Sequence, residues 1–298
     1  MKDTTASLRQ LLEQPGGQSR LLRELLNDPD LNVQLLKLAM HARGYNNFQN
    51  GLVSGELFLI QKVLPQLGIR TCLDVGAAQG EYSRLLLQSL PDCQVYGCEP
   101  LSLNLPILEA LAREEPLRFH LWPWALGDQE EQAWLRYNPA VLQHASLCDN
   151  LDSIDYLDNH QCERVSVRRL DAIWPTLARA EPLDFIKIDS EGWEANVLDG
   201  AASILRCHPP RAIQLEFNRH HLFLGQTLLS LAKRLADHAV FQLLPNRLER
   251  RDPASILANI FEFSNFVFIR SDFIEAIHTF TVSRHHPKRS ADHPDSPT

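Results

Sequence analysis

From residue 70 onward, short apolar runs alternate with amphipathic segments, and this alternation constrains the fold more than any other feature of the chain. The runs TCLDVG, QVYGCEP and LRFHLWPWALGD are separated by the helix-like stretches EYSRLLLQSL and LPILEALAREE. The pattern returns in PLDFIKIDSEG, WEANVLDGAASIL, RAIQLEFN and TLLSLAKRLADH. Such alternation predicts parallel βαβ units and a doubly wound α/β sheet. The last runs, VFQLLP and FSNFVFIR, have no long helix between them and predict a hairpin.

The segments outside this alternation predict the domain organisation. Residues 1–50 repeat leucine at three- and four-residue spacing, which predicts a helical cap on a single core. Residues 51–282 carry the sheet, and within them 129–170 form an insertion with two strand-like runs, AWLRYN and RVSVRRL. Residues 283–298 are polar and rich in proline, which predicts a disordered tail.

Composition limits the class of protein. The chain of 298 residues is 44% hydrophobic and 22% charged, which excludes a disordered or fibrous protein. Its net charge of −8 argues against a nucleic-acid binder, which normally carries a basic surface. No apolar run has the length of a secretory or membrane segment, so we expect a cytoplasmic protein. None of the six cysteines forms a CxxC pair, which favours buried free thiols over disulfides or zinc.

The insertion also contains four aspartates at three-residue intervals: Asp149, Asp152, Asp155 and Asp158. One interpretation is a cation site. The alternative is a solvated face, because Leu151, Ile154 and Leu157 repeat on the same interval and indicate a packing stripe. We favour the solvated face.

The sharpest local motif is LDVGAAQGEYS, at the end of the first strand of the alternation. Ligands of open α/β sheets bind at the carboxyl ends of the strands, and a glycine turn lets a ligand lie against the backbone. Asp74 precedes Gly76 by two residues, and Gly80 completes a Gly-x-x-x-Gly spacing. A carboxylate there would repel the pyrophosphate of a dinucleotide but attract the ammonium group of S-adenosylmethionine. A purely structural glycine turn would not explain this acid.

Two further positions extend this binding site. Glu99 ends the second strand, where an acid can accept both ribose hydroxyls of a nucleoside ligand. That role suits NAD as well as S-adenosylmethionine, but together with Asp74 it favours S-adenosylmethionine. After the third strand, Ala125 and Leu126 would be apolar neighbours of the adenine. Trp124 is open to either a core or a cofactor role.

A second cluster follows the fourth strand, in IKIDSEG. Alternation places Lys187 and Asp189 on one side of the strand, and Glu191 lies in the loop just beyond. Two carboxylates and a cation at this edge of the sheet are typical of an active site. The alternative is a capping loop with Ser190 as the N-cap of the next helix. His220, after the fifth strand, is a candidate base or a surface histidine.

These motifs together resemble the FkbM family of S-adenosylmethionine-dependent methyltransferases. LDVGAAQGEYS, YGCEP, ALGD, RRLDAIW, DFIKIDSEGWEANVLDGA and IQLEF occur in the family's order, over residues 50–218. The resemblance implies a class I methyltransferase (Rossmann-like) fold, with seven strands of which the last is antiparallel. It also implies methyl transfer to a hydroxyl oxygen of a sugar, glycolipid or polyketide-like acceptor. The cofactor contacts that it implies, with neighbours in the same motifs, are Glu56, Asp74, Gly76, Ala77, Gly80, Tyr82, Ser83, Glu99 and Pro100.

For the reaction, we expect in-line displacement at the sulfonium carbon, with a base for the acceptor hydroxyl. Asp189 is the first candidate base, and Glu191 and His220 are the alternatives. A divalent ion shared by Asp189, Glu191 and Glu216 is conceivable, but we expect a metal-free site because no spacing demands a metal.

Two other functions compete with this interpretation. One is an NAD-dependent oxidoreductase, and the other is an inactive methyltransferase-like scaffold protein. As partners we expect a small-molecule or glycan acceptor, neither nucleic acid nor a membrane, and conceivably a second copy of the chain in a homodimer. The residues contain no signature of the acceptor itself.

Overall fold

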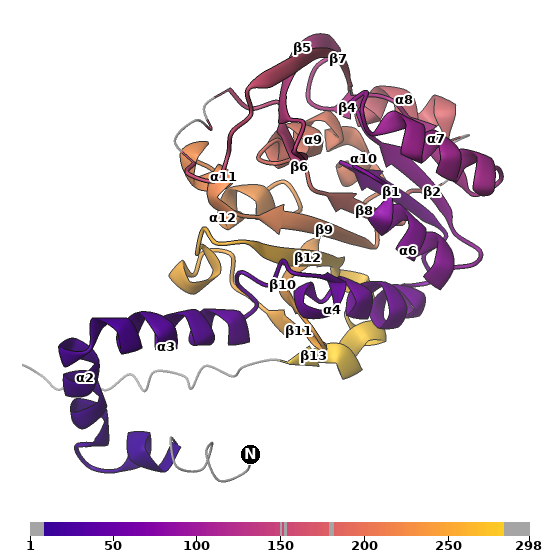
Figure 1. Cartoon of the computed structure of the whole chain (residues 1–298). Helices are drawn as coiled ribbons and strands as arrows, with labels where there is room; N and C mark the ends of the chain where they lie inside the picture. Colours follow the sequence, from indigo (N-terminus) through magenta and orange to yellow (C-terminus); the bar gives the residue numbers. More distant parts are fainter. Residues whose placement is uncertain (1–8, 150, 152–153, 179–181, 283–298) are drawn as a thin grey trace, which may run out of the picture. The chain divides into compact units, whose positions relative to one another are not determined.

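A computed structural model describes residues 9–149, 151, 154–178 and 182–282 (Figure 1). The predicted tail, 283–298, lies outside the described residues. The chain divides into two compact units, Met1–Asn46 and Asn47–Thr298, close to the predicted boundary at residue 50. That the first unit caps the core stays a prediction.

The first unit contains the helices α2 (Gly17–Asn27) and α3 (Pro29–Ala42), and residues 9–13 are also helical. Asp28 separates them, and its carboxylate accepts a hydrogen bond of 2.9 Å from the backbone N–H of Leu31. Pro29 occupies the first position of α3, where its missing N–H costs no helical hydrogen bond.

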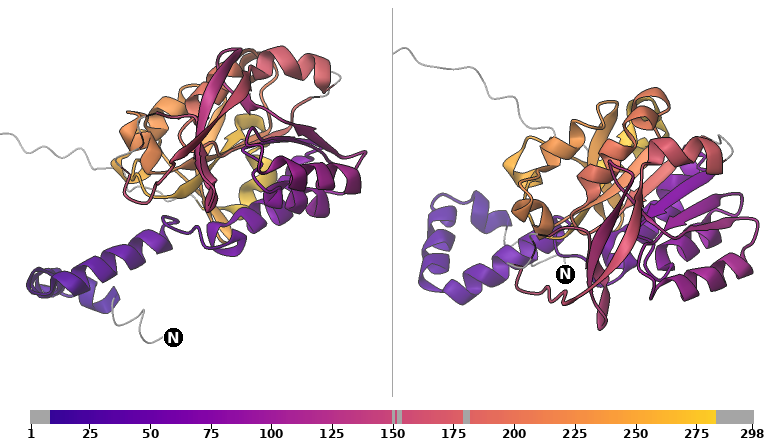
Figure 2. Two further views of the ribbon diagram at one scale, coloured as in Figure 1. Left: turned by 45° about the horizontal axis from the view of Figure 1, so that its top comes forward. Right: turned by 90° about the horizontal axis from the view of Figure 1, so that it is seen from above.

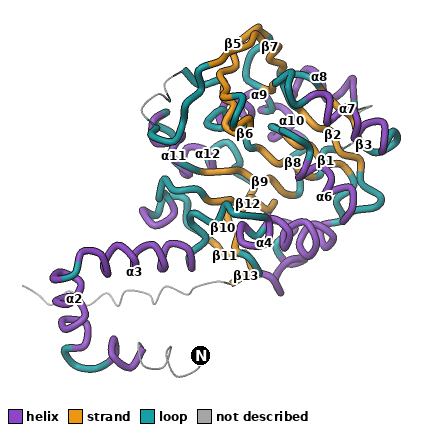
Figure 3. Tube along the Cα trace, in the orientation of Figure 1, coloured by secondary structure: helices purple, strands orange, loops and turns teal. Residues whose placement is uncertain are grey.

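The second unit is built on a large mixed sheet. Among the described residues its strands follow the order β13-β11-β10-β12-β9-β8-β1-β2-β3, which Figure 3 shows as an orange band through the molecule. The five strands from β3 to β9 are parallel, and β12 is antiparallel to both of its neighbours, β9 and β10. The bounds are β1 Thr71–Val75, β2 Gln94–Cys98, β3 Phe119–Trp122, β8 Phe185–Ile188, β9 Ala212–Phe217, β10 His238–Leu244, β11 Arg247–Arg250, β12 Ser264–Arg270 and β13 Thr281–Val282.

This order confirms the predicted α/β fold of class I methyltransferases. Seven strands, β3-β2-β1-β8-β9-β12-β10, form the expected sheet, and the last of them in the chain, β12, is the reversed one. The sheet has more strands than the seven expected, because β11 and β13 extend it at one edge. The predicted hairpin is also incomplete. β10 pairs antiparallel with β12 as expected, but it also pairs antiparallel with β11, which lies between them in the chain. β11 is short and polar in sequence, RLER, so apolar patterning does not reveal it.

Helices cover both faces of the large sheet. On one face Leu73, Ile186 and Ile213 pack against α8 (Leu170–Leu177), α9 (Glu194–Gly200), α10 (Ala202–Cys207) and α12 (Leu228–Ala232). On the other face Cys72 and Phe185 pack against α6 (Glu81–Ser89), α7 (Leu105–Glu114) and the helical turns from Glu56 to Leu67. Those turns are α5 (Glu56–Phe58), η1 (Leu59–Val63) and η2 (Leu64–Leu67). Burial on both faces explains why these strands are continuous apolar runs.

The insertion, together with the short strand β4 that precedes it, forms a separate four-stranded sheet in the order β4-β7-β5-β6, whose long ribbons are prominent in Figure 2. Its strands are β4 Ala125–Leu126, β5 Glu131–Asn138, β6 Val141–Ser146 and β7 Gln161–Arg168. The run LRFHLWPWALGD was expected to be one strand but supplies two, β3 and β4, which belong to different sheets. Pro123 separates them, because it has no N–H with which to continue a ladder.

The aspartates of the insertion behave as solvated groups. The exposed carboxylates of Asp149 and Asp155 form ion pairs with Arg136 at 3.3 Å and Arg219 at 3.0 Å. Leu151 and Ile154 are buried, as the packing stripe predicts. Asp152 lies outside the described residues.

Short elements complete the unit: α4 (Gly51–Ser54), α11 (Arg219–Phe223), η3 (Ile256–Ala258), η4 (Ser271–Phe273) and η5 (Glu275–Phe280).

All six cysteines are free; four are buried as expected, whereas Cys162 and Cys207 are exposed. Within the described part of the chain, no helix combines the length and the apolar character that crossing a membrane requires.

Candidate active site

A row of polar side chains crosses the middle of the large sheet. Asp74 on β1 lies opposite Lys187 on β8, and Lys187 lies opposite Gln214 on β9. All three are buried, and they are polar although their neighbours along each strand are apolar. Side chains alternate between the faces of a sheet, so the row projects toward the face that α6 covers. Burying charged groups is costly unless they are paired, and the row supplies those partners.

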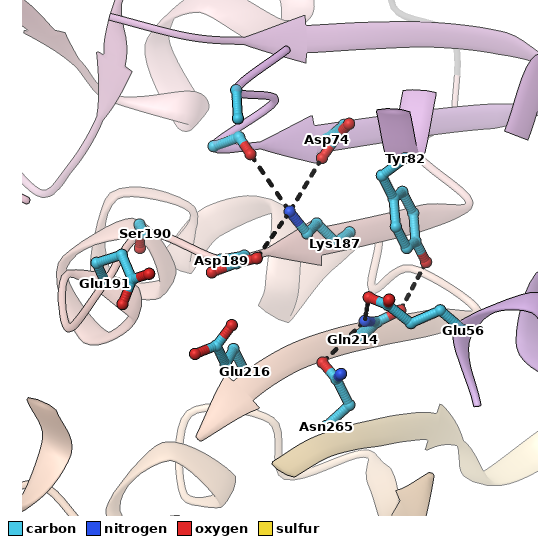
Figure 4. Close-up of polar contacts among 12 residues, drawn as sticks. Glu56, Asp74, Tyr82, Lys187, Asp189, Ser190, Glu191, Gln214, Glu216 and Asn265 are labelled. Carbon is cyan, nitrogen blue, oxygen red and sulfur yellow. Dashed lines mark hydrogen bonds and ion pairs between the residues drawn. The ribbon is translucent and has the colours of Figure 1, made fainter. Parts of the chain in front are cut away.

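Lys187 is the centre of this row (Figure 4). Its Nζ lies 3.5 Å from Asp74 Oδ1 and 3.2 Å from Asp189 Oδ2, and it donates a hydrogen bond of 3.3 Å to the carbonyl oxygen of Gly76. Burial opposes the charged form, but the carboxylates of Asp189, Asp74 and Glu56 outweigh it and raise the pKa of Lys187. The predicted placement of Lys187 and Asp189 on one side of β8 is confirmed.

Asp74 is linked to the other charged groups of the site by its ion pair with Lys187. Its carboxylate has no exposed surface, and Oδ2 accepts a hydrogen bond of 2.6 Å from Ser83 Oγ. Burial raises the pKa of Asp74, although Lys187 and Ser83 act in the opposite direction. Ser83 is itself fully buried and uses its hydroxyl on Asp74. Asp74 and Ser83, both predicted cofactor contacts, therefore have no surface that a ligand can touch. Asp74 pairs with Lys187, and Ser83 holds Asp74 in place.

Glu56 joins the row from outside the sheet. Its Oε1 accepts a hydrogen bond of 3.0 Å from Gln214 Nε2, and its Oε2 accepts one of 3.0 Å from Ser54 Oγ. Gln214 also accepts a hydrogen bond of 2.6 Å from the Tyr82 hydroxyl, and the ring of Tyr82 lies 5.4 Å below Lys187 Nζ. Burial raises the pKa of Glu56. The structure thus brings Glu56 and Tyr82 together with Lys187, as Figure 4 shows.

Backbone hydrogen bonds hold the glycine turn that follows β1. The N–H groups of Gly76 and Ala77 donate to the Cys98 carbonyl oxygen at 3.0 and 2.9 Å, and Gly80 N–H donates to Ala77. Gly76 has a φ of 77°, and a Cβ there would lie 1.9 Å from the carbonyl oxygen of Asp189. The contact between the β1 and β8 loops therefore requires glycine at position 76, and the approach of a ligand to this turn stays a prediction.

Glu99 locks the same turn from β2. Its Oε2 accepts a hydrogen bond of 2.7 Å from Ala78 N–H, and its Oε1 accepts one of 2.9 Å from Leu101 N–H. Asn104 also hydrogen-bonds to this carboxylate, so about one of its four acceptor positions remains for a hydroxyl group. Burial raises the pKa of Glu99, although these N–H groups oppose the shift. Pro100 follows it and is half-buried.

Three carboxylates converge beyond Lys187: Asp189, Glu191 and Glu216 each place an oxygen within 4.8 Å of the others. Burial and the negative charges of Asp189 and Glu191 raise the pKa of Glu216 well above its usual range. Glu216 also accepts a hydrogen bond of 2.5 Å from Asn218 Nδ2. Asp189 is one-third exposed, so it is the member of this cluster that a ligand can reach.

The loop that carries Glu191 is held by Glu194. Glu194 Oε1 accepts hydrogen bonds from Ser190 N–H at 2.9 Å and Gly192 N–H at 3.4 Å, and its Oε2 lies 3.1 Å from His221 Nε2. Burial alone would raise the pKa of Glu194, but His221 and the backbone N–H groups lower it to about 2. These contacts hold Glu191 at a φ of 53°, a conformation that is uncommon for a residue with a side chain.

The capping alternative for this loop is wrong. The helix after β8 begins at Glu194 with Trp193 as its N-cap, so Ser190 does not cap it. His220 is also not the surface residue of the other interpretation, because it is 1% exposed. Its Nδ1 lies 3.0 Å from Glu191 Oε2 and 2.9 Å from Asn218 Oδ1. Burial lowers the pKa of His220, but Glu191 outweighs it and the net shift is upward.

The predicted adenine neighbours lie in the core. Ala125 and Leu126 are buried, and Leu126 belongs to the cluster that packs between the sheet and α8 and α9. Leu126 therefore offers no surface to a ligand. Trp124 packs against the same cluster, with its ring 6.0 Å from that of Trp122 and its Nε1 without a hydrogen-bond partner in the described structure.

Sequence reasoning missed Gln214, Asn218 and Glu194 as parts of the site. For Gln214 a signal existed, because a polar residue inside the apolar run AIQLEF is unusual in a buried strand. Glu216 was considered only as a metal ligand. No local pattern indicates Glu194, because its partner His221 is distant in the chain.

Comparison with known proteins gives a consistent result. Residues 74–251 match the family described as Methyltransferase FkbM domain. The chain is 30% identical over 188 residues to the 2-O-methyltransferase NoeI of Sinorhizobium fredii, a match that covers 58% of this chain and 70% of that protein.

Solved structures also align with the chain. One is the precorrin-6y C5,15-methyltransferase of Geobacter metallireducens, with a TM-score of 0.38 and 12% identity over 72% of this chain and 87% of the other. Another is the fibrillarin pre-rRNA processing protein of Methanococcus jannaschii, with a TM-score of 0.41 and 13% identity over 74% and 76% of the two chains.

Proposed function

The chain belongs to the FkbM methyltransferase family, and on this premise we propose that it transfers a methyl group from S-adenosylmethionine to a hydroxyl oxygen of a sugar, glycolipid or polyketide-like acceptor. Membership of the family makes the protein a methyltransferase and removes the oxidoreductase alternative. Transfer to oxygen is supported by the relative NoeI, an O-methyltransferase.

The observation that carries the choice of cofactor is an excess of negative charge. Glu56, Asp74, Asp189, Glu191 and Glu216 surround two groups that can be cationic, Lys187 and His220. A buried excess of carboxylates attracts a further cation. S-adenosylmethionine carries a sulfonium and an ammonium group, whereas the pyrophosphate of a dinucleotide would be repelled.

The donor set also fits the nucleoside part of this cofactor. Glu99 has free acceptor capacity at the carboxyl end of β2, where an acid suits ribose hydroxyls. Asn104 Oδ1, which is buried nearby, has no hydrogen-bond partner among the described residues. Both are acceptors that hydroxyl or amino groups can satisfy. Glu99 would hold the ribose, and the carboxylates around Lys187 would hold the methionine end.

When bound, S-adenosylmethionine supplies an electrophilic methyl group. The protein contributes the position of the acceptor oxygen in line with that methyl group, which can account for about 7–11 kcal/mol of the barrier. Asp189 is the base that we favour, because it is accessible. Protonated Glu216 can donate a hydrogen bond to the Asp189 carboxylate and keep its own proton, while Lys187 holds the other side of that carboxylate. His220 lies behind Glu191 and positions it.

Calorimetric titration with S-adenosylmethionine and S-adenosylhomocysteine tests this function. Several carboxyl groups have raised pKa values, so a bound cation lowers those pKa values and releases protons. We therefore expect both ligands to bind, with more proton release for the sulfonium compound in buffers of different ionisation enthalpy. NAD serves as the control and should give no heat. Absence of heat with both nucleosides, on folded protein, would refute the proposal.

A further inference from the structure

One segment of the insertion lies against the acid cluster and is well placed to contact the acceptor. Ser146, at the end of β6, donates a hydrogen bond of 2.8 Å to the carbonyl oxygen of Glu191. Further on, Asp155 forms an ion pair of 3.0 Å with Arg219 of α11. Between these two anchors, Leu151 and Ile154 pack with Trp193 and Leu224. The segment is thus tied to the loops that follow both β8 and β9.

Tyr156 is the residue of this segment with the most unusual environment. Its ring makes edge contacts with His220 at 6.3 Å and His144 at 5.6 Å, and the Arg219 guanidinium lies 6.0 Å from the ring centre. Despite these neighbours the residue is 46% exposed. His220 is itself bonded to Glu191, so the exposed ring lies beside the acid cluster.

The electrostatics agree with this position. Partial burial and the negative charges of Glu191 and Glu216 raise the pKa of Tyr156 to about 12. The hydroxyl therefore stays protonated, and the ring remains a neutral, amphipathic surface next to hydrogen-bond acceptors. An anionic ligand would be repelled by the same carboxylates.

We propose that Tyr156 forms one wall of the acceptor subsite and selects a neutral, ring-shaped polyol by stacking against its apolar face. This inference rests on the proposed function. The apolar C–H face of a saturated sugar ring matches an aromatic surface, and a hydroxyl group of the ring can donate a hydrogen bond to Asp189, the accessible member of the acid cluster. An open-chain polyol has the same hydroxyl groups but no flat face, so it should not be selected.

Trp134 provides a matched control. It is 58% exposed and lies on β5 of the same inserted sheet, but no contact links it to the acid cluster among the described residues. If exposed aromatic rings of this sheet bound sugars in general, Trp134→Ala and Tyr156→Ala would have the same effect. Tyr156→Phe keeps the ring and removes only the hydroxyl.

The test is saturation-transfer NMR on the full chain, with and without S-adenosylhomocysteine. The probes are methyl glucoside, methyl mannoside and methyl rhamnoside, with sorbitol as the open-chain polyol. We expect saturation of at least one glycoside in preference to sorbitol. Tyr156→Ala should weaken that binding about tenfold, which corresponds to the loss of one stacked aromatic contact. Tyr156→Phe and Trp134→Ala should bind as the unmodified chain does.

The outcomes separate this inference from the proposed function. If calorimetry shows S-adenosylhomocysteine binding but no glycoside is saturated, or Tyr156→Ala binds glycosides as well as the unmodified chain, the subsite is refuted and the methyltransferase proposal stands. If neither S-adenosylmethionine nor S-adenosylhomocysteine binds, the proposed function fails. Glycoside binding to the unliganded chain, lost only in Tyr156→Ala, would then still support the stacking wall.

Discussion

Single residues set the electrostatics of this site by placing charge where little water can reach it. Lys187 is buried on β8, and it is tolerated because Asp74 and Asp189 pair with it on both sides. Removing either partner takes away one of the negative charges that stabilise the buried ammonium group, whereas removing the lysine increases the excess of negative charge. The accessible partner, Asp189, and the enclosed partner, Asp74, should therefore respond differently to substitution.

We expect Asp189→Asn to lower the turnover number by about a hundredfold or more, because it removes the favoured base. Binding of S-adenosylmethionine should persist, since Glu56 and Glu99 remain. Steady-state kinetics and calorimetry on the same preparation check both expectations. Asp149→Asn, an exposed aspartate of the insertion, is the control. Turnover at the unmodified rate would show that another group is the base.

Glu194 gives a prediction about stability and pH. Its folded pKa of about 2 lies below its ordinary value of 4.5, so its contribution to stability is present above about pH 5 and is lost as the pH falls toward 2. Glu194→Gln should therefore reduce the free energy of unfolding by about 3 kcal/mol at pH 7, with less effect at low pH. Urea denaturation at several pH values measures this. A pH-independent difference between the two proteins would contradict the assignment.

At the scale of elements, the site exists because parallel strands end at one edge of the sheet. The register aligns Asp74, Lys187 and Gln214, and a slip by one residue would turn these side chains to the opposite face. The loops after β1 and β8 then meet, and the closeness of that contact requires Gly76. The inserted sheet adds a third contributor through Ser146 and Tyr156.

Gly76→Ala tests the contact between the β1 and β8 loops. The new Cβ would lie 1.9 Å from the Asp189 carbonyl oxygen, so one of the two loops must move. Gly225→Ala is the matched control, because Gly225 has a φ of 65° but nothing within 4 Å of its Cβ position. We expect Gly76→Ala to destabilise the protein by at least about 2 kcal/mol more than the control. It should also weaken S-adenosylmethionine binding. Equal unfolding midpoints for the two variants would contradict this account.

At the scale of the whole molecule, the chain divides into two compact units. Every residue assigned above to the site lies within Asn47–Thr298. Helix α3 of the first unit buries none of its residues and exposes Leu36 and Leu38. Membership of the family likewise rests on residues 74–251, which lie entirely in the second unit.

Deletion of residues 1–46 should therefore leave S-adenosylmethionine binding unchanged. The second unit has its own core on both faces of the sheet, and Glu56 is retained. Calorimetry and thermal unfolding of the shortened chain, beside the full chain, check this expectation. Loss of cooperative unfolding, or of cofactor binding, would show that the first unit belongs to the working fold.

Apolar periodicity and short motifs are local properties, so they predicted the main alternation of strands and helices, the position of the glycine turn and the family. They did not reveal the short polar strand β11 or the division of LRFHLWPWALGD between β3 and β4. The sequence by itself also determined that Lys187 and Asp189 share a side of β8, since alternation along one strand suffices. Only the tertiary structure decided that Asp74 is enclosed, that Glu194 pairs with His221 and that Tyr156 lies beside the acid cluster. Each of these depends on segments far apart in the chain, and burial and pairing are properties of the packed molecule rather than of any single segment.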